Sequence, residues 1–431
     1  MNALARLVAD HAAIAGALPA ATALRDRRSA ALALVAKDGL PGPREENWRY
    51  ATLRSLERVG FPPPLALQDE AIAQARALLP GPLEGFRRFV FVDGLFAAPL
   101  SAGPGEANGV ALDTQAAMAA DFGRHSPDAR LGALAVAFAP QAAAITAAPD
   151  AVGDLELVFV ALRSGEQAAS YPALTVEAGA QAHLRLVERH IGRDDGASFS
   201  NAAVDLRIGA GAQVRHTRVQ QLGASAVHFD TLRAELGAGA FYGLDAVSLG
   251  AQAARTTLHA RLAGRGARIA YASSAALDGA QVNDTHAVVE HDAPDSETAE
   301  DFRGIAAGRS RVAFNGHIIM RAGAARAASR QSLKSLLAGP GAEADVRPQL
   351  EIYTDDVKAS HGATAGKLDE QMLFYLLSRG IEARTAKSLL KWAFLTELVA
   401  RIGVPALRTQ IERAFAQRFT GEDAAVAREL A

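Results

Sequence analysis

The sequence contains no cysteine. Without thiols the chain can form no disulfide, hold no structural zinc through thiolates and use no cysteine nucleophile. It also lacks an excess of charge, because 45 basic side chains stand against 47 acidic ones and the formal net charge is −2. A nearly neutral chain offers no electrostatic footprint for nucleic acid or for an anionic membrane. Neither is therefore expected as a partner.

Long apolar runs are missing too. No window approaches the roughly 18 uncharged apolar residues that a membrane-spanning helix needs. The apolar stretch Ala12–Leu24 follows Asp10 and His11 and contains Pro19, which is not the pattern of a secretory signal. The chain is predicted to be cytoplasmic. Its 431 residues, 49% of them apolar, suit two or three globular domains, or one domain extended by repeats.

The familiar motifs of catalysis are absent as well. The nearest match to a phosphate-binding loop, Gly362 to Lys367, has three residues between its glycines and no hydroxyl residue after the lysine. Neither a G-x-S-x-G elbow nor an H-E-x-x-H zinc helix is present. A carbohydrate-active enzyme on a β-helix is the enzymatic alternative, but the adjacent Asp355 and Asp356 would point to opposite faces of a strand. We predict that the chain is not an enzyme and that any ATP dependence comes from a partner.

Glycine, with 38 residues, recurs at a regular period. Gly179, Gly211, Gly239 and Gly266 follow one another at steps of 32, 28 and 27 residues, within the similar segments "EAGAQA", "GAGAQV", "GAGAFY" and "GRGARI". Two turn signals per period predict two strands of about ten residues in each repeat. Such a unit must stack to bury its inner face, as a β-solenoid or a sandwich of long hairpins, and the repeated text favours stacking. The repeated glycines are expected at corresponding turns, with positive φ angles.

The pattern divides the chain into three regions. Helical spacing of apolar residues predicts helices at Arg27–Lys37 and Gln68–Leu79. Between them, "REENWRYATLRSL" is predicted to be a surface helix anchored by Trp48 and Tyr50. From Phe86 the residues alternate, with a hairpin turn at Asp93-Gly94. The predicted organisation is an N-terminal helical region over 1–85, a strand core over 86–366 and a C-terminal helical domain over 367–431.

The C-terminal region is predicted to hold three helices. Asp369 can cap the first, which Gly380 ends, Thr385 can cap the second and Pro405 can open the third. The second helix carries two apolar stripes: Leu390, Phe394, Leu398 and Ile402 on one, and Leu389, Trp392, Thr396 and Val399 on the other. One stripe suffices to dock a helix on its own core. The other indicates a further contact, either within the domain or with another chain.

His361 is the candidate site residue. It lies in "TDDVKASHGATAGKLDEQ", after the last strand-like run, between Ser360 and Gly362. A histidine in a turn is accessible to a metal or a partner, and imidazole is a common neutral ligand of iron and zinc. The alternative is a turn histidine that bonds only to backbone groups.

Three stretches carry a resemblance over nearly the whole chain: "PQLEIYTDDVKASHGATAGKLDEQMLFYLLSRGI", "FRGIAAGRSRVAFNGHI" and "REENWRYATL". They closely resemble the SufB/SufD family of the SUF iron–sulfur cluster assembly system, its SufD branch in particular. The resemblance implies a right-handed parallel β-helix between helical ends. It also implies a scaffold subunit that binds the homologous scaffold SufB and the ABC-type ATPase SufC, with SufC docking on the C-terminal helices. That docking would use the stripe of Leu389, Trp392, Thr396 and Val399.

The same resemblance gives His361 a role. In the family this histidine is implicated in nascent cluster assembly at the SufB–SufD interface, beside a cysteine of SufB. Some relatives carry a second cysteine where this chain has Ala359, so all sulfur must be held by partners. No permanent cofactor is expected, only a transient iron–sulfur cluster at the interface, and a homodimer is allowed for the isolated chain. A purely structural role in the same complex, with no ligand at His361, is the alternative.

Overall fold

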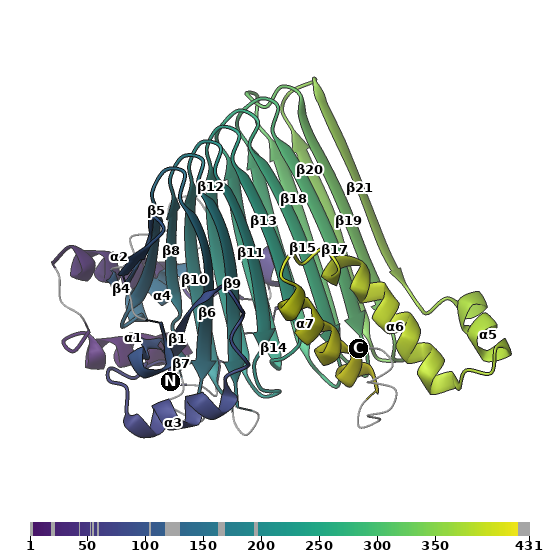
Figure 1. The fold of residues 1–431 in the computed structure, drawn as a ribbon, viewed down its shortest axis with the longest axis horizontal. Helices are drawn as coiled ribbons and strands as arrows, with labels where there is room; N and C mark the ends of the chain where they lie inside the picture. Colours follow the sequence, from purple (N-terminus) through teal and green to yellow (C-terminus); the bar gives the residue numbers. More distant parts are fainter. Residues whose placement is uncertain are drawn as a thin grey trace.

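The computed structural model describes residues 3–18, 22–42, 44–51, 53, 56–57, 60–102, 105–116, 130–162, 169–193 and 197–420. In this part of the chain, strands run from residue 87 to residue 366, with helices before and after them. Successive strands alternate between two facing sheets, so that the chain winds as a stack of coils (Figure 1). The predicted stacked β-solenoid is confirmed.

The first sheet, sheet A, has ten strands, and all neighbours in it are parallel except β2 and β1. The β1–β2 pair is a hairpin through Asp93 and Gly94, both with positive φ, as predicted. In spatial order the strands are β2 (Leu95–Phe96), β1 (Arg87–Val92), β6 (Val152–Ala161), β9 (His183–Gly192), β11 (Gln213–Gln221), β13 (Phe241–Ser248), β15 (Arg268–Leu277), β17 (Glu297–Ala306), β19 (Ala327–Leu337) and β21 (Val357–Gly366).

The second sheet, sheet B, has eleven strands, of which ten form one continuous path. Only its first pairs, β3–β4 and β4–β5, are antiparallel. In spatial order the path is β20 (Glu343–Ile352), β18 (Arg311–Met320), β16 (Val282–His291), β14 (Ala253–Leu262), β12 (Val227–Leu236), β10 (Phe199–Ile208), β8 (Ala173–Ala178), β5 (Ala142–Ala147), β4 (Val110–Ala116) and β3 (Gly105–Ala107), with β7 (Ala169–Ser170) paired to β10.

One corner of each coil turns through a left-handed residue. Gly211, Gly239 and Gly266 have φ angles of 68°, 65° and 69°, as predicted, and each donates its N–H to a carbonyl of the next coil. The prediction fails for Gly179, because the equivalent residue is Gln181, with φ 58°. Asp150, Asp295 and Arg326 adopt the same conformation at the corresponding corners. Inter-coil hydrogen bonds therefore hold the turn even where a Cβ disfavours it.

The main core lies between the two sheets. Side chains alternate along each strand, so that Leu184 and Leu186 of β9 point inward, while Val187 points to the outer face of sheet A. The inward residues of successive coils form continuous apolar rows, including Val204, Leu232 and Leu258 on sheet B. Burial of these rows stabilises the stack by about 25 cal/mol per Å² of apolar surface.

N-terminal elements cover the outer face of sheet B. They are α1 (Ala3–Ile14), α2 (Thr22–Asp38), the short 3₁₀ helix η1 (Glu46–Trp48) and α4 (Arg130–Phe138), while α3 (Asp69–Leu78) packs on β1, beside the 3₁₀ turn η3 (Ala98–Leu100). The prediction of a surface helix around Trp48 is wrong. Trp48 is 1% exposed, and the guanidinium of Arg255 lies 3.8 Å from the centre of its ring. Burial against sheet B, rather than helix propensity, fixes this segment.

Three helices follow the solenoid: α5 (Glu370–Ser378), α6 (Ala383–Val399) and α7 (Pro405–Thr420). The Asp369 carboxylate caps α5 by accepting from two backbone N–H groups, and Gly380 follows with φ 83°, as predicted. Thr385 is not the cap of α6, because Glu382 accepts from the N–H groups of Arg384 and Thr385. Helices α6 and α7 pack on the outer face of sheet A, whereas α5 projects away from it (Figure 1).

None of the described helices is both long and apolar enough to cross a membrane.

Candidate functional site

His361 lies in the middle of β21, the last strand of sheet A. The predicted turn is therefore wrong. The local sequence is a run of Ala, Ser, Gly and Thr that has little strand propensity of its own, but ladder pairing with β19 extends it as a strand from Val357 to Gly366. The side chain is exposed, because β21 forms the edge of sheet A and β20 forms the edge of sheet B. Both sheets end together at the right of Figure 1, where the solenoid is open.

The ring of His361 belongs to the inward-facing row of its sheet. Val357, four residues earlier on the same strand face, packs against the core between the sheets. Going back one coil at a time, the residues in register with His361 are Gln331, Glu300 and Tyr271. They are separated by 30, 31 and 29 residues, which is the repeat period, so the sequence already held the signal that places them in one column. Sequence reasoning missed Gln331 and Glu300 because their strands were not aligned in register.

Glu300 and Gln331 form a buried pair behind His361. The Nε2 of Gln331 donates to Oε2 of Glu300 over 2.8 Å, and the two residues are 2% and 0% exposed respectively. Burial raises the pKa of Glu300 to about 7, and the hydrogen bond from Gln331 only partly opposes this shift. Across the interior, Gly316 makes room for the pair, since a Cβ there would lie 2.6 Å from Nε2 of Gln331.

This pKa shift predicts a pH dependence that Glu300→Gln removes. The folded chain keeps the Glu300 proton up to about pH 7, whereas an unfolded glutamic acid loses it near pH 4.3. Between these values the folded state binds more protons, so the free energy of unfolding of the wild type falls as pH rises. We expect the stability of the variant relative to wild type to increase by roughly 2 kcal/mol from about pH 5 to about pH 7, in urea titrations. A pH-independent difference would contradict the shift.

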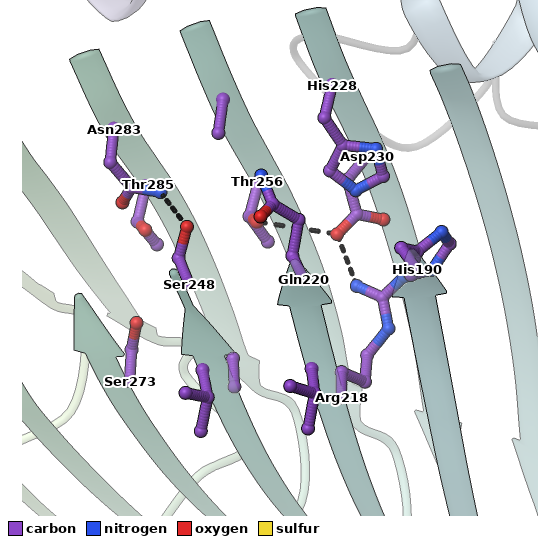
Figure 2. A pocket seen from close by; sticks show the side chains of 14 residues that line it. His190, Arg218, Gln220, His228, Asp230, Ser248, Thr256, Ser273, Asn283 and Thr285 are labelled. Carbon is purple, nitrogen blue, oxygen red and sulfur yellow. Dashed lines mark hydrogen bonds and ion pairs between the residues drawn. The ribbon is translucent and has the colours of Figure 1, made fainter. Parts of the chain in front are cut away.

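A charged cluster fills the interior further back in the solenoid. Arg218 of β11 donates to Glu188 through Nη2 (2.8 Å) and Nε (3.0 Å) and also pairs with Asp230 of sheet B. Two histidines bond to the same carboxylate, His190 over 2.6 Å and His216 over 3.0 Å. Figure 2 shows Arg218 reaching toward Asp230 beside His190, at a small polar cavity. Sequence reasoning had treated these histidines as isolated structural residues, whereas the coil stacking brings them together.

The electrostatics of this cluster are those of a satisfied ion network. Burial opposes ionisation of Glu188, but Arg218 and the two histidines hold its pKa well below the usual range. Burial, together with the charges of His190 and Arg218, lowers the pKa of His228 well below its ordinary value. Arg218 keeps its charge because two carboxylates compensate its burial. The network specifies and stabilises the interior, and it exposes no reactive group.

No group of three or more His, Cys, Asp or Glu side chains converges on a metal position within the described ranges. His361 can therefore offer one nitrogen to a metal, and the remaining ligands must come from elsewhere.

The predicted docking stripe on α6 is only partly accessible. Leu389, Trp392 and Thr396 are half-buried. Val399 is 1% exposed and belongs to the cluster between α6, α7 and sheet A, so its predicted place on an outward stripe is wrong. The reason is that α6 lies along sheet A, where its last turn contacts the core from both stripes.

Helix α5 carries apolar side chains that sequence reasoning did not single out. Phe374 is 72% exposed, and Met372, Tyr375 and Leu377 are each at least 40% exposed. An exposed apolar group of this kind is typical of an interaction surface. The signal was present in "DEQMLFYLLSRG", where apolar residues surround a helix too short to bury all of them.

Comparison with known proteins gives these features a family. Residues 160–394, more than half of the chain, match the family model described as "SUF system FeS cluster assembly, SufBD core domain". The chain belongs to the SufBD family. It is 30% identical to the iron–sulfur cluster assembly protein SufD of Escherichia coli, an alignment covering 89% of this chain and 90% of that protein. An iron–sulfur cluster assembly SufBD family protein of Synechocystis is 24% identical, with 90% of each chain covered.

The SufBD core match extends from β6 into α6 and so contains the His361 column and the charged cluster. A family protein of Mycobacterium tuberculosis is 27% identical over 58% of this chain and 64% of its own length. The chain is thus a SufD-like protein of the SUF system, and its role lies in iron–sulfur cluster assembly.

Proposed function

We propose that this chain is a non-catalytic scaffold subunit that presents His361 to a nascent iron–sulfur cluster at an interface with a SufB-like partner. The observation that supports it most is the position of His361 at the open end of the solenoid, on the inward face of an exposed edge strand. The cluster is cargo in this proposal, held only during assembly.

The open end suits a homologous partner. The outer edges of β20 and β21 leave a row of backbone donors and acceptors without strand partners. A second solenoid that ends in the same way could continue both sheets at once, through main-chain hydrogen bonds. Such pairing would bury His361 between the two chains, where water no longer competes for its ring nitrogens.

The ligand chemistry requires that partner. Iron–sulfur clusters are commonly held by cysteine thiolates, and imidazole replaces them at some positions. This chain has no cysteine, and Ala359 and Ser360 beside His361 supply no soft donor. The proposed division of labour is therefore an imidazole from this chain and sulfur ligands from the partner.

A second surface would serve an ATPase subunit of the SufC type. We assign it to the accessible part of the α6 stripe, Leu389, Trp392 and Thr396, together with the exposed apolar residues of α5. Both helices lie at the C-terminal end of the chain, away from the β21 edge strand's interior face. One scaffold could thus hold a cluster site and an energy-converting subunit at the same time.

Co-purification tests the subunit assignment. The chain should elute with a SufB-like and an ATPase-like protein when all three are co-expressed, and by itself it should hydrolyse no ATP, because it lacks a phosphate-binding loop. Failure to form a complex with either protein would contradict the proposal.

The docking surface has its own prediction. Phe374→Asp and Trp392→Asp should each weaken binding of the ATPase subunit by about tenfold or more, because a charge is desolvated at an apolar contact. Phe374→Asp should leave the melting temperature unchanged, since that side chain is exposed. Val399→Asp is the control and should unfold the C-terminal helices instead. Calorimetric titration with the purified ATPase subunit measures the first effect and thermal melts the second; undiminished binding by both docking variants would place the surface elsewhere.

A further inference from the structure

We infer that Gln331 is a positioning residue, which accepts a hydrogen bond from the ring N–H of His361 and so decides which ring nitrogen is free to bind a metal. The inference rests on the proposed role of His361. It concerns a residue of the preceding coil that lies beneath the surface, 30 positions earlier in the chain.

The first observation is an unsatisfied carbonyl oxygen. Gln331 is 2% exposed, and its Nε2 donates to Glu300, but its Oε1 has no hydrogen-bond partner. A buried amide oxygen without a partner costs about 1–3 kcal/mol. Because the amide nitrogen is turned toward the previous coil, the oxygen remains available to a donor on the following coil.

The second observation is the donor's place. His361 is the residue of the following coil in register with Gln331, and neighbouring strands of a sheet lie about 4.8 Å apart. Both side chains belong to the inward face, as shown by Val357 on β21 and Leu333 on β19, which are members or neighbours of the central core. Rotation of the exposed ring about its own side-chain torsions suffices to form the bond, so no backbone movement is required.

The third observation is that the amide of Gln331 is held in place. Glu300 is fully buried and fixes the Nε2 end. On the facing sheet, Gly316 leaves just enough room, because a Cβ there would lie 2.6 Å from Gln331 and 2.7 Å from Glu300. The glycine thus permits a polar pair in an otherwise apolar section of the core.

The consequence for His361 follows from imidazole chemistry. A neutral imidazole carries one N–H and one bare nitrogen, and a hydrogen bond to the N–H selects the tautomer. Ligating histidines generally donate their second ring nitrogen to such an acceptor, and loss of that acceptor typically weakens metal binding by about 10–100-fold. Gln331 would leave the bare nitrogen of His361 directed toward the partner side of the open end.

Nitrogen-15 NMR of the purified chain labelled at histidine tests this inference, with the His361 signals identified by their loss in His361→Ala. In the wild type we expect one protonated and one bare ring nitrogen, with an N–H signal protected from water. In Gln331→Met the two nitrogen shifts should average, and exchange of the N–H should accelerate by about tenfold, which corresponds to one lost hydrogen bond.

Two controls separate this effect from general damage. Glu300→Gln retains an acceptor for Nε2 of Gln331 and should preserve the wild-type ring signals. Gln349→Met removes a glutamine of β20 that bonds to Asn315 on the adjacent strand but whose position faces outward, and it should also leave His361 unchanged. Thermal melts of all variants check folding.

The outcomes distinguish the inference from the proposed function. An unprotected ring N–H in the wild type, or a protected one in Gln331→Met, overturns the role of Gln331 whatever His361 does. If Gln331→Met releases the ring as expected while His361→Ala leaves cluster yield unchanged, the positioning contact stands and the proposed function fails.

Discussion

Replacing His361 with alanine is expected to lower the yield of assembled iron–sulfur cluster by about tenfold or more, while the chain folds and binds its partners normally. The side chain is exposed, so its loss removes little packing. A cluster intermediate would lose a ligand that no neighbour replaces, and weakening of even an outer-shell contact to a metal ligand costs about 10–100-fold in affinity. The measurement is cluster content, by absorption and iron analysis, of the complex purified from cells.

His183→Ala is the matched control. His183 is also an exposed histidine on a strand of sheet A, but it opens β9, several coils away from the open end. Its replacement should leave cluster yield at the wild-type value. Wild-type yields from both variants would refute the role of His361. A His361 variant that melts at lower temperature and fails to bind its partners would instead favour the purely structural alternative.

Arg218→Met is expected to produce the largest loss of stability, about 3–5 kcal/mol. Arg218 is 5% exposed and compensates two buried carboxylates, Glu188 and Asp230. Without it, both acids must either remain charged without a cation or bind protons at neutral pH. Urea denaturation followed by circular dichroism measures the change.

Arg185→Met provides the comparison. Arg185 pairs with Asp154 across the same kind of strand ladder, but on the outer face, where its side chain is 48% exposed. Solvent screens this pair, so its loss should cost less than about 1 kcal/mol. Adding Glu188→Gln and Asp230→Asn to Arg218→Met should recover part of the lost stability by removing the uncompensated charges. Equal losses from the two arginine variants would show that the interior pair is no stronger than the exposed one.

The sequence by itself determined the architecture, because the solenoid is written as a local repeat. A period near 28 residues with two turns is visible without any knowledge of contacts, and stacking follows because one coil cannot bury its inner face. Caps are equally local. Asp369 and Gly380 act within a few residues of themselves, and their roles were predicted correctly. The family resemblance agreed with this reading and was confirmed by the SufBD core match.

Only the tertiary structure decided what depends on pairing between coils. The segment around His361 reads as a turn from its small residues, yet pairing with β19 makes it a strand. Gln181 adopts a left-handed conformation at a corner where the repeat had indicated Gly179, because hydrogen bonds to the next coil hold it there. Local propensity is worth fractions of a kcal/mol per residue, and a continuous ladder outweighs it.

Burial was the other quantity that the sequence left undetermined. Trp48 and Val399 both looked available to solvent or to partners, but the first packs on Arg255 and the second lies beneath α7 and sheet A. Helical periodicity shows which residues share a face but not which surface covers that face. The column from Glu300 through Gln331 to His361 combines both kinds of information. Its spacing was present in the sequence as the repeat period, whereas its inward direction and buried hydrogen bond required the folded coils.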